Sequence, residues 1–161
     1  MKESGAHAVK LEGGHEIKES IKRILNAGIP VMGHLGLTPQ SIYKFGTYTV
    51  RAKEDVEAEQ LKEDARLLEK LGCFAVVLEK IPAKLAKEVA ASISIPVIGI
   101  GAGSGTDAQV LVLHDMLGMT ETAPKFVQNF MDGAPSIQAA LKAFVDAVKA
   151  GEYPKEEHTY S

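Results

Sequence analysis

Three apolar runs in this chain each end in a side chain that can take part in acid–base chemistry. The three terminal residues are Glu12, His34 and Glu79. Parallel strands carry their ligand sites at their carboxyl ends, because several strands open there onto one mouth. Together with Lys10, which precedes Glu12 by two residues, these side chains are predicted to form one pocket for acid–base chemistry and cation binding.

Each of these residues also has a purely structural interpretation. Lys10 and Glu12 point to the same side of a strand, where they bind a metal with an oxyanionic substrate or form a salt bridge at the sheet rim. Glu79 follows five apolar residues, so we expect it to be partly removed from water. It is therefore a candidate general base, unless it only pairs with a cation such as Lys80. His34 contacts a substrate oxygen or relays a proton, or it is a satisfied structural histidine.

Other patterns carry less chemistry. Gly13 and Gly14 allow close approach to a ligand or make a tight turn. The glycines within residues 99–105 match neither the dinucleotide fingerprint nor the phosphate loop, so they are expected to lie close to a substrate or to form a turn. No nucleophile elbow is present. The remaining histidines have no zinc-type spacing: His7, His15, His114 and His158.

Composition narrows the class of protein. The chain has 161 residues, of which 45 % are apolar and 24 % charged, and this is enough for a single domain over residues 1–161. A formal net charge of -3 gives no basic field for nucleic acid or anionic lipid. No run approaches the roughly 20 apolar residues of a membrane span, and the start lacks a signal-peptide core. The single cysteine, Cys73, indicates a core thiol in a reducing compartment, so a cytoplasmic protein is expected.

The apolar periodicity alternates between strands and amphipathic helices. Strands are predicted at residues 6–12, 29–35, 73–79, 95–100 and 110–114. Helices are predicted at residues 16–27, 55–71, 82–91, 124–131 and 135–150. A long connection covers residues 36–53, and a buried helix remains an alternative for residues 110–114. This alternation predicts an α/β fold with a parallel sheet.

Two architectures are compatible with this pattern. A flavodoxin-like sheet of five strands is complete at this length, whereas a (β/α)₈ barrel normally needs about 250 residues. Length alone therefore favours the flavodoxin-like sheet.

Several segments together resemble one enzyme family closely. They are VKLEGG at 9–14, GHLGLTPQS at 33–41, VLE at 77–79, IPVIGIGAG at 95–103, LHD at 113–115 and YPKEEH at 153–158. The resemblance is to ketopantoate hydroxymethyltransferase and extends over essentially the whole chain. It implies a partial (β/α)₈ barrel with about five parallel strands and their helices, the C-terminal part of the family fold.

The resemblance also implies an activity and roles for the candidate residues. The family uses Mg²⁺ and transfers a hydroxymethyl group from 5,10-methylenetetrahydrofolate to 3-methyl-2-oxobutanoate, giving 2-dehydropantoate in pantothenate biosynthesis. By this resemblance Lys10 contacts the keto acid, Glu12 is a metal ligand and Glu79 is the proton acceptor. His34 matches a catalytic-pocket histidine. Another 2-keto acid enzyme of the phosphoenolpyruvate/pyruvate barrel superfamily is the alternative enzyme.

The chain departs from the family at its beginning. The family has about three further strand–helix units before the match to Lys10, and they supply an Asp-Ser pair and another aspartate. Because Mg²⁺ takes about six oxygen ligands, Glu12 alone is expected to bind it weakly and support little turnover. The expectation is a truncated product, half of a split enzyme or a non-catalytic remnant. Bare sheet edges further predict a homo-oligomer or a separate N-terminal half as partner.

Overall fold

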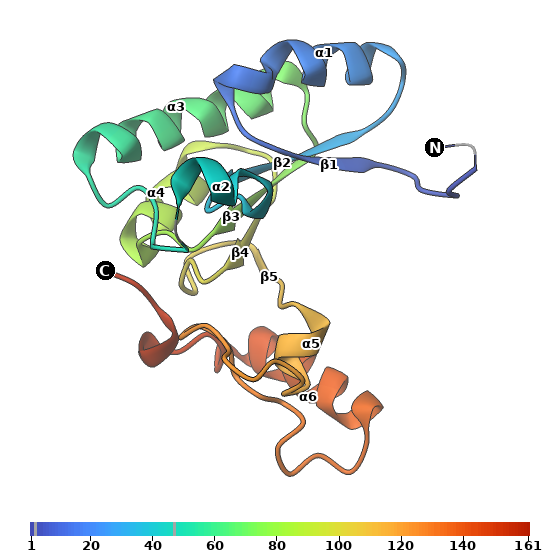
Figure 1. Cartoon of the computed structure of the whole chain (residues 1–161), viewed down its shortest axis with the longest axis vertical. Coiled ribbons are helices and arrows are strands. Elements are labelled where there is room, and N and C mark those ends of the chain that lie inside the picture. The colour runs from blue at the N-terminus through green and yellow to red at the C-terminus, as the bar shows by residue number, and fades with distance from the viewer. Residues whose placement is uncertain (2, 47) are drawn as a thin grey trace.

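The computed structural model describes residues 1, 3–46 and 48–161 of the chain. Lys2, in the start of the chain, and Thr47, in the predicted connection, lie outside the described residues. A parallel sheet of five strands forms the centre, in the order β1-β2-β3-β4-β5 (Figure 1). The strands are β1 Val9–Glu12, β2 Val31–Gly36, β3 Ala75–Glu79, β4 Val97–Ile100 and β5 Ala108–Gln109.

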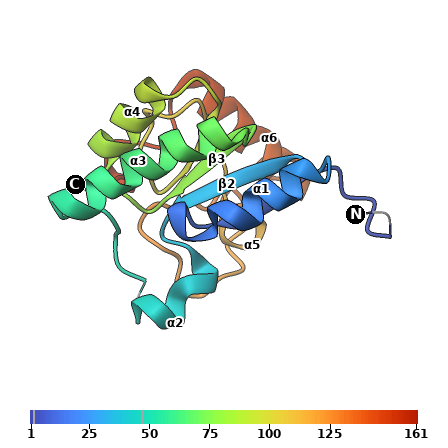
Figure 2. The ribbon, with the colours of Figure 1, turned by 90° about the horizontal axis from the view of Figure 1, so that it is seen from above.

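The strand order distinguishes between the two architectures. A flavodoxin-like sheet reverses its strand order at a switch point and carries helices on both faces. Here the order never reverses, and the three helices that connect successive strands all pack side by side against the same face (Figure 2). They are α1 Lys18–Asn26, α3 Asp55–Leu71 and α4 Ala83–Ser92. The prediction of a partial (β/α)₈ barrel with five parallel strands is confirmed, and the flavodoxin-like alternative is wrong.

The main hydrophobic core lies between the sheet and these helices. Leu68 of α3 and Val76 and Leu78 of β3 are fully buried in it, as the alternation of side chains along a strand requires. The predicted helix at 55–71 is found with those bounds and ends at Gly72, whose φ of 99° is a left-handed helix stop. Cys73 is a core residue as predicted, and burial raises the pKa of its thiol.

A second apolar cluster covers the other face of the sheet. Val77 of β3 and Ile100 of β4 belong to it, together with Phe126, Phe130 and Tyr153 from the C-terminal third of the chain. The hydroxyl of Tyr153 donates a hydrogen bond of 2.6 Å to the carbonyl of Phe126. The helices of this part, α5 Leu113–Met116 and α6 Ile137–Ala150, lie below the sheet in Figure 1.

Two sequence predictions are wrong in this C-terminal part. The fifth strand is only Ala108–Gln109, and the apolar run predicted as a strand at 110–114 leads into α5. The backbone leaves the sheet after β5, the edge strand, and Val112 is half exposed. Residues 124–131 form no helix. Phe126 and Phe130 have helical spacing, but each is an anchor in the second cluster on a non-helical backbone.

The remaining elements are short. They are η1 His15–Ile17, η2 Pro39–Ser41, α2 Ile42–Phe45 and η3 Glu156–His158. Two of them, η2 and α2, lie within the predicted connection at 36–53, so that connection is partly helical. In the described part of the chain, every helix is too short or too polar to cross a bilayer.

Candidate functional site

The register of three neighbouring strands positions the predicted site residues. In the parallel pairing of β1 with β2, Glu12 stands opposite His34, and in that of β2 with β3, Glu79 stands opposite Gly36. Lys10 precedes Glu12 by two residues, so both side chains leave the same face of β1. The carboxyl ends of these strands therefore bring side chains from three separate segments to one place.

The imidazole of His34 lies at the centre of this group. Its side chain is 3 % exposed, its Nδ1 lies 3.0 Å from Lys10 Nζ, and its Nε2 lies 3.2 Å from Glu79 Oε2. Glu12 Oε1 lies 3.7 Å from both Lys10 Nζ and His34 Nδ1. The structure thus brings all four sequence-predicted residues together. We call Lys10, Glu12, His34 and Glu79 the histidine network.

Lys10 determines which nitrogen of His34 carries the proton. A lysine ammonium has hydrogen-bond donors and no acceptor, so Nδ1 of His34 must accept from it. The proton of the neutral imidazole then resides on Nε2. Nε2 is buried and makes no well-aligned hydrogen bond with any described residue, although the Glu79 carboxylate is close. A buried donor left this way is open to a further acceptor, such as a substrate atom.

Glu12 offers a cation one carboxylate in a mostly buried position. Its side chain is 7 % exposed, Oε1 faces Lys10 and His34, and Oε2 accepts a hydrogen bond of 2.8 Å from the Gln40 backbone N–H. Mg²⁺ takes about six oxygen ligands. Within the described residues, no group of three metal-ligating side chains forms around Glu12. Glu12 therefore fits a magnesium site as one contributor among several.

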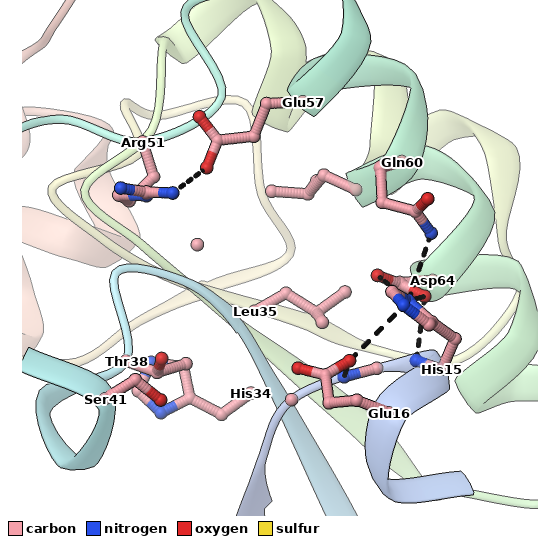
Figure 3. A pocket seen from close by; sticks show the side chains of 14 residues that line it. His15, Glu16, His34, Leu35, Thr38, Ser41, Arg51, Glu57, Gln60 and Asp64 are labelled. Atoms are coloured by element: carbon pink, nitrogen blue, oxygen red, sulfur yellow. Dashed lines mark hydrogen bonds and ion pairs between the residues drawn. The ribbon is translucent and has the colours of Figure 1, made fainter. Parts of the chain in front are cut away.

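A cavity of about 170 Å³ lies beside the network, between the strand ends and α3 (Figure 3). His34 lines it, but Lys10, Glu12 and Glu79 do not. One wall holds the ion pair between Arg51 and Glu57, and the other wall holds a cluster of polar side chains. The enclosed space and the histidine network therefore share only one of the four residues.

The polar wall of the cavity was missed by the sequence analysis. Asp64 of α3 is buried. Its Oδ1 accepts a hydrogen bond of 2.9 Å from the backbone N–H of His15 and lies 3.1 Å from Nδ1 of the His15 ring. These residues lie 49 positions apart, so no local spacing could have revealed the pair. A Cβ on Gly14 would lie 2.2 Å from Asp64 Cγ. The close approach that Gly14 allows is therefore to Asp64 of the same chain.

Comparisons with known proteins agree with the motifs. The family model for ketopantoate hydroxymethyltransferase matches residues 1–156. The 3-methyl-2-oxobutanoate hydroxymethyltransferase of Christiangramia forsetii is 68 % identical over 161 residues, covering 99 % of this chain and 59 % of that protein. The proteins of the same name from Flavobacterium johnsoniae and Porphyromonas gingivalis are 67 % and 62 % identical over the same shares.

A solved structure, the YdjI aldolase from Escherichia coli K12, aligns with 98 % of this chain and 55 % of its own chain. Its TM-score of 0.42 and identity of 16 % are too low to support an argument. The chain spans 59 % of the length of the curated relatives named above. With nearly every residue inside the matched region of the family model, the chain belongs to the ketopantoate hydroxymethyltransferase family.

Proposed function

We propose that this chain carries part of the active site for transfer of a hydroxymethyl group from 5,10-methylenetetrahydrofolate to 3-methyl-2-oxobutanoate, giving 2-dehydropantoate for pantothenate biosynthesis. The observation that carries the proposal is the contact series from Lys10 through His34 to Glu79, at strand ends of a chain of this family. The carbon of the new group comes from the folate, and its hydroxyl oxygen comes from water.

The first step is removal of the proton on the branched carbon next to the ketone. Glu79 is the proton acceptor, because its carboxylate is mostly buried at 17 % exposure and lies next to the His34 ring. The Lys10 ammonium stabilises the negative charge that develops on the keto acid. Water releases the one-carbon unit from the two folate nitrogens as formaldehyde and leaves tetrahydrofolate. The enolate carbon then bonds to the formaldehyde carbon, and the former carbonyl oxygen takes up a proton to become the new hydroxyl.

His34 positions Glu79. With Nδ1 held by Lys10, the Nε2–H of the imidazole lies beside the Glu79 carboxylate, with Nε2 3.2 Å from Oε2, and orients that carboxylate before the reaction. In this proposal His34 is a positioning residue for Glu79.

Glu12 is the residue of this chain that would hold Mg²⁺, with the remaining ligands from substrate, water and other parts of the protein. When bound, the ion supplies positive charge at the keto oxygen, which lowers the cost of enolate formation. Glu12 also fixes the loop at Gln40 through the bond to the Gln40 N–H.

Association with a further chain is part of the proposal. In the described sheet β1 and β5 each have a neighbour on one side only, and open edges of this kind pair readily. The partner is a second copy or a chain with the rest of the family fold. A cytoplasmic location is proposed as well, since the buried thiol of Cys73 suits a reducing compartment.

Hydrogen exchange on the substrate tests the proposal without needing the folate. The purified chain is given 3-methyl-2-oxobutanoate deuterated at the branched carbon, with Mg²⁺, and loss of deuterium is followed by NMR. The measurement is repeated after adding a fragment of the Christiangramia forsetii protein that this chain does not match. We expect exchange that disappears in Glu79→Gln and persists in Glu19→Gln, a control carboxylate on the surface of α1 paired with Lys22.

Three outcomes would count against this function. Absence of exchange under both conditions would identify the chain as a non-catalytic remnant. Exchange that survives in Glu79→Gln would remove the proposed base. Exchange with other 2-keto acids at an equal rate would favour a different enzyme of the keto acid barrel superfamily.

A further inference from the structure

The polar wall of the cavity has the donor set of a metal site. Nδ1 of His15 lies 3.1 Å from Asp64 Oδ1 and 3.6 Å from Glu16 Oε2. One ligand atom from each of the three residues lies within 4.8 Å of the others. Zinc binds nitrogen and oxygen ligands at about 2.0–2.2 Å, which places tetrahedral ligands roughly 3.4 Å apart. The His15–Asp64 and His15–Glu16 separations lie on either side of that value, and all three atoms lie within 4.8 Å of one another, so small side-chain movements would let an ion reach all three.

The backbone already holds both carboxylates in place. The His15 N–H donates to Asp64 Oδ1 at 2.9 Å, and the Gly14 N–H donates to Glu16 Oε2 at 3.1 Å. Hydrogen bonds of this kind orient metal ligands and reduce the ordering that binding requires. Gln60 Nε2 also lies 3.2 Å from His15 Nδ1, on the same wall. Figure 3 shows these side chains turned toward one another at the edge of the cavity.

We propose that His15, Glu16 and Asp64 bind a divalent first-row transition-metal ion of the zinc type. An imidazole with two carboxylates suits Zn²⁺ or Co²⁺ better than Mg²⁺, which prefers oxygen ligands only. Three protein ligands leave a fourth position open. That position faces the cavity, whose lining includes Thr38, Ser41 and Arg51, so water or a small oxyanion is the fourth ligand.

This site is distinct from the one at Glu12. Glu12 does not line the cavity, and it faces Lys10 and His34 instead. The three ligands come from the segment after β1 and from α3, so a bound ion would tie these segments together. The inference does not depend on the proposed transferase activity. Its alternative is a salt bridge between His15 and Asp64 that holds the loop after β1 and binds no ion.

Metal titration of the full chain distinguishes the metal site from a salt bridge that binds no ion. Zn²⁺ alone is titrated calorimetrically, and Co²⁺ alone is followed by its visible absorption, which reports a tetrahedral site. We expect one ion per chain and a tetrahedral cobalt spectrum. His15→Gln and Glu16→Gln should each weaken zinc binding at least about tenfold. Both residues are exposed, so these changes are expected to leave the fold intact.

Controls exclude other sources of zinc binding. His114→Gln removes another exposed histidine, and Glu12→Gln removes the carboxylate of the histidine network, and both should leave zinc affinity unchanged. The proposal is overturned if the chain binds no zinc, if His15→Gln binds it as tightly as the parent, or if the Glu12→Gln change abolishes binding. A failure here leaves the deuterium exchange at Glu79 unaffected.

Discussion

Replacing Lys10 with methionine should shift the tautomer ratio of His34 toward the form that carries its proton on Nδ1. In the parent chain the Lys10 ammonium occupies Nδ1 at 3.0 Å and leaves the proton on Nε2. Methionine is unbranched like lysine and only one atom shorter, but it has no hydrogen-bond donor. Nδ1 then has the Glu12 carboxylate as its nearest charged neighbour, with Oε1 at 3.7 Å, and that carboxylate accepts from an Nδ1–H.

The size of the change follows from the exposure of the lysine. A hydrogen bond to a charged group contributes about 1.5–3 kcal/mol. Lys10 is 43 % exposed, so water screens the contact and the lower end, about 1.5 kcal/mol, applies. This free energy corresponds to about a tenfold change in the ratio of the two imidazole tautomers.

Long-range proton–nitrogen NMR correlations of the histidine rings measure this ratio directly, in ¹⁵N-labelled protein and without substrate. Lys22→Met, which breaks a surface ion pair with Glu19, is the matched control and should leave His34 unchanged. The reasoning is refuted if the parent carries its proton on Nδ1. It is refuted equally if Lys10→Met keeps the parent's tautomer ratio.

Two further changes test the backbone and the pH response. Gly36→Ala places a Cβ 2.3 Å from the Glu79 carbonyl at a φ of +89°, and the left-handed backbone plus the overlap should lower the free energy of unfolding by roughly 2–5 kcal/mol in urea titrations. Gly133 also has a left-handed backbone, with a φ of +71°, but an added Cβ there would have nothing within 4 Å. Gly133→Ala should therefore lower the free energy of unfolding only by the cost of the left-handed backbone, and an equal decrease in both variants would contradict the steric explanation. Burial holds the pKa of His158 below its usual 6.5, and its Nδ1 accepts the Lys155 N–H, so the folded chain favours the neutral ring. Above pH 6.5 His158 is mostly neutral in the folded and in the unfolded chain. As the pH falls below 6.5 the unfolded chain binds the proton first, so the free energy of unfolding decreases. Thermal unfolding between about pH 7 and 5 should therefore show a steeper decline for the parent than for His158→Gln, and parallel curves would disprove this role.

The strand-end residues were predictable because their signal is local. A charged or imidazole side chain at the end of an apolar run is visible in the sequence, and the two-residue period places Lys10 and Glu12 on one face. Parallel pairing of β1, β2 and β3 then brings these residues together with His34 and Glu79. The contacts around the imidazole follow from register and could be anticipated as a group.

The polar wall of the cavity could not be predicted in this way. Asp64 has the position of a polar residue in an amphipathic helix, and its contact with His15 depends on how α3 packs over the loop after β1. The error at residues 124–131 has a similar cause. Phe126 and Phe130 are four residues apart, as in a helix, but their burial is decided by the second cluster on the far face of the sheet.

The hydrogen bond from the Gln40 backbone N–H to Glu12 Oε2 couples cation binding at Glu12 to the order of the loop at residues 38–41. A cation that draws on both oxygens of Glu12 competes with that amide for Oε2, and the loop at residues 38–41 is then held less firmly. Thermodynamic linkage requires the converse, so anything that clamps this loop changes the affinity of Glu12 for the ion by the same factor. The order of this loop and the binding of an ion at Glu12 are thus coupled through Oε2 of that carboxylate.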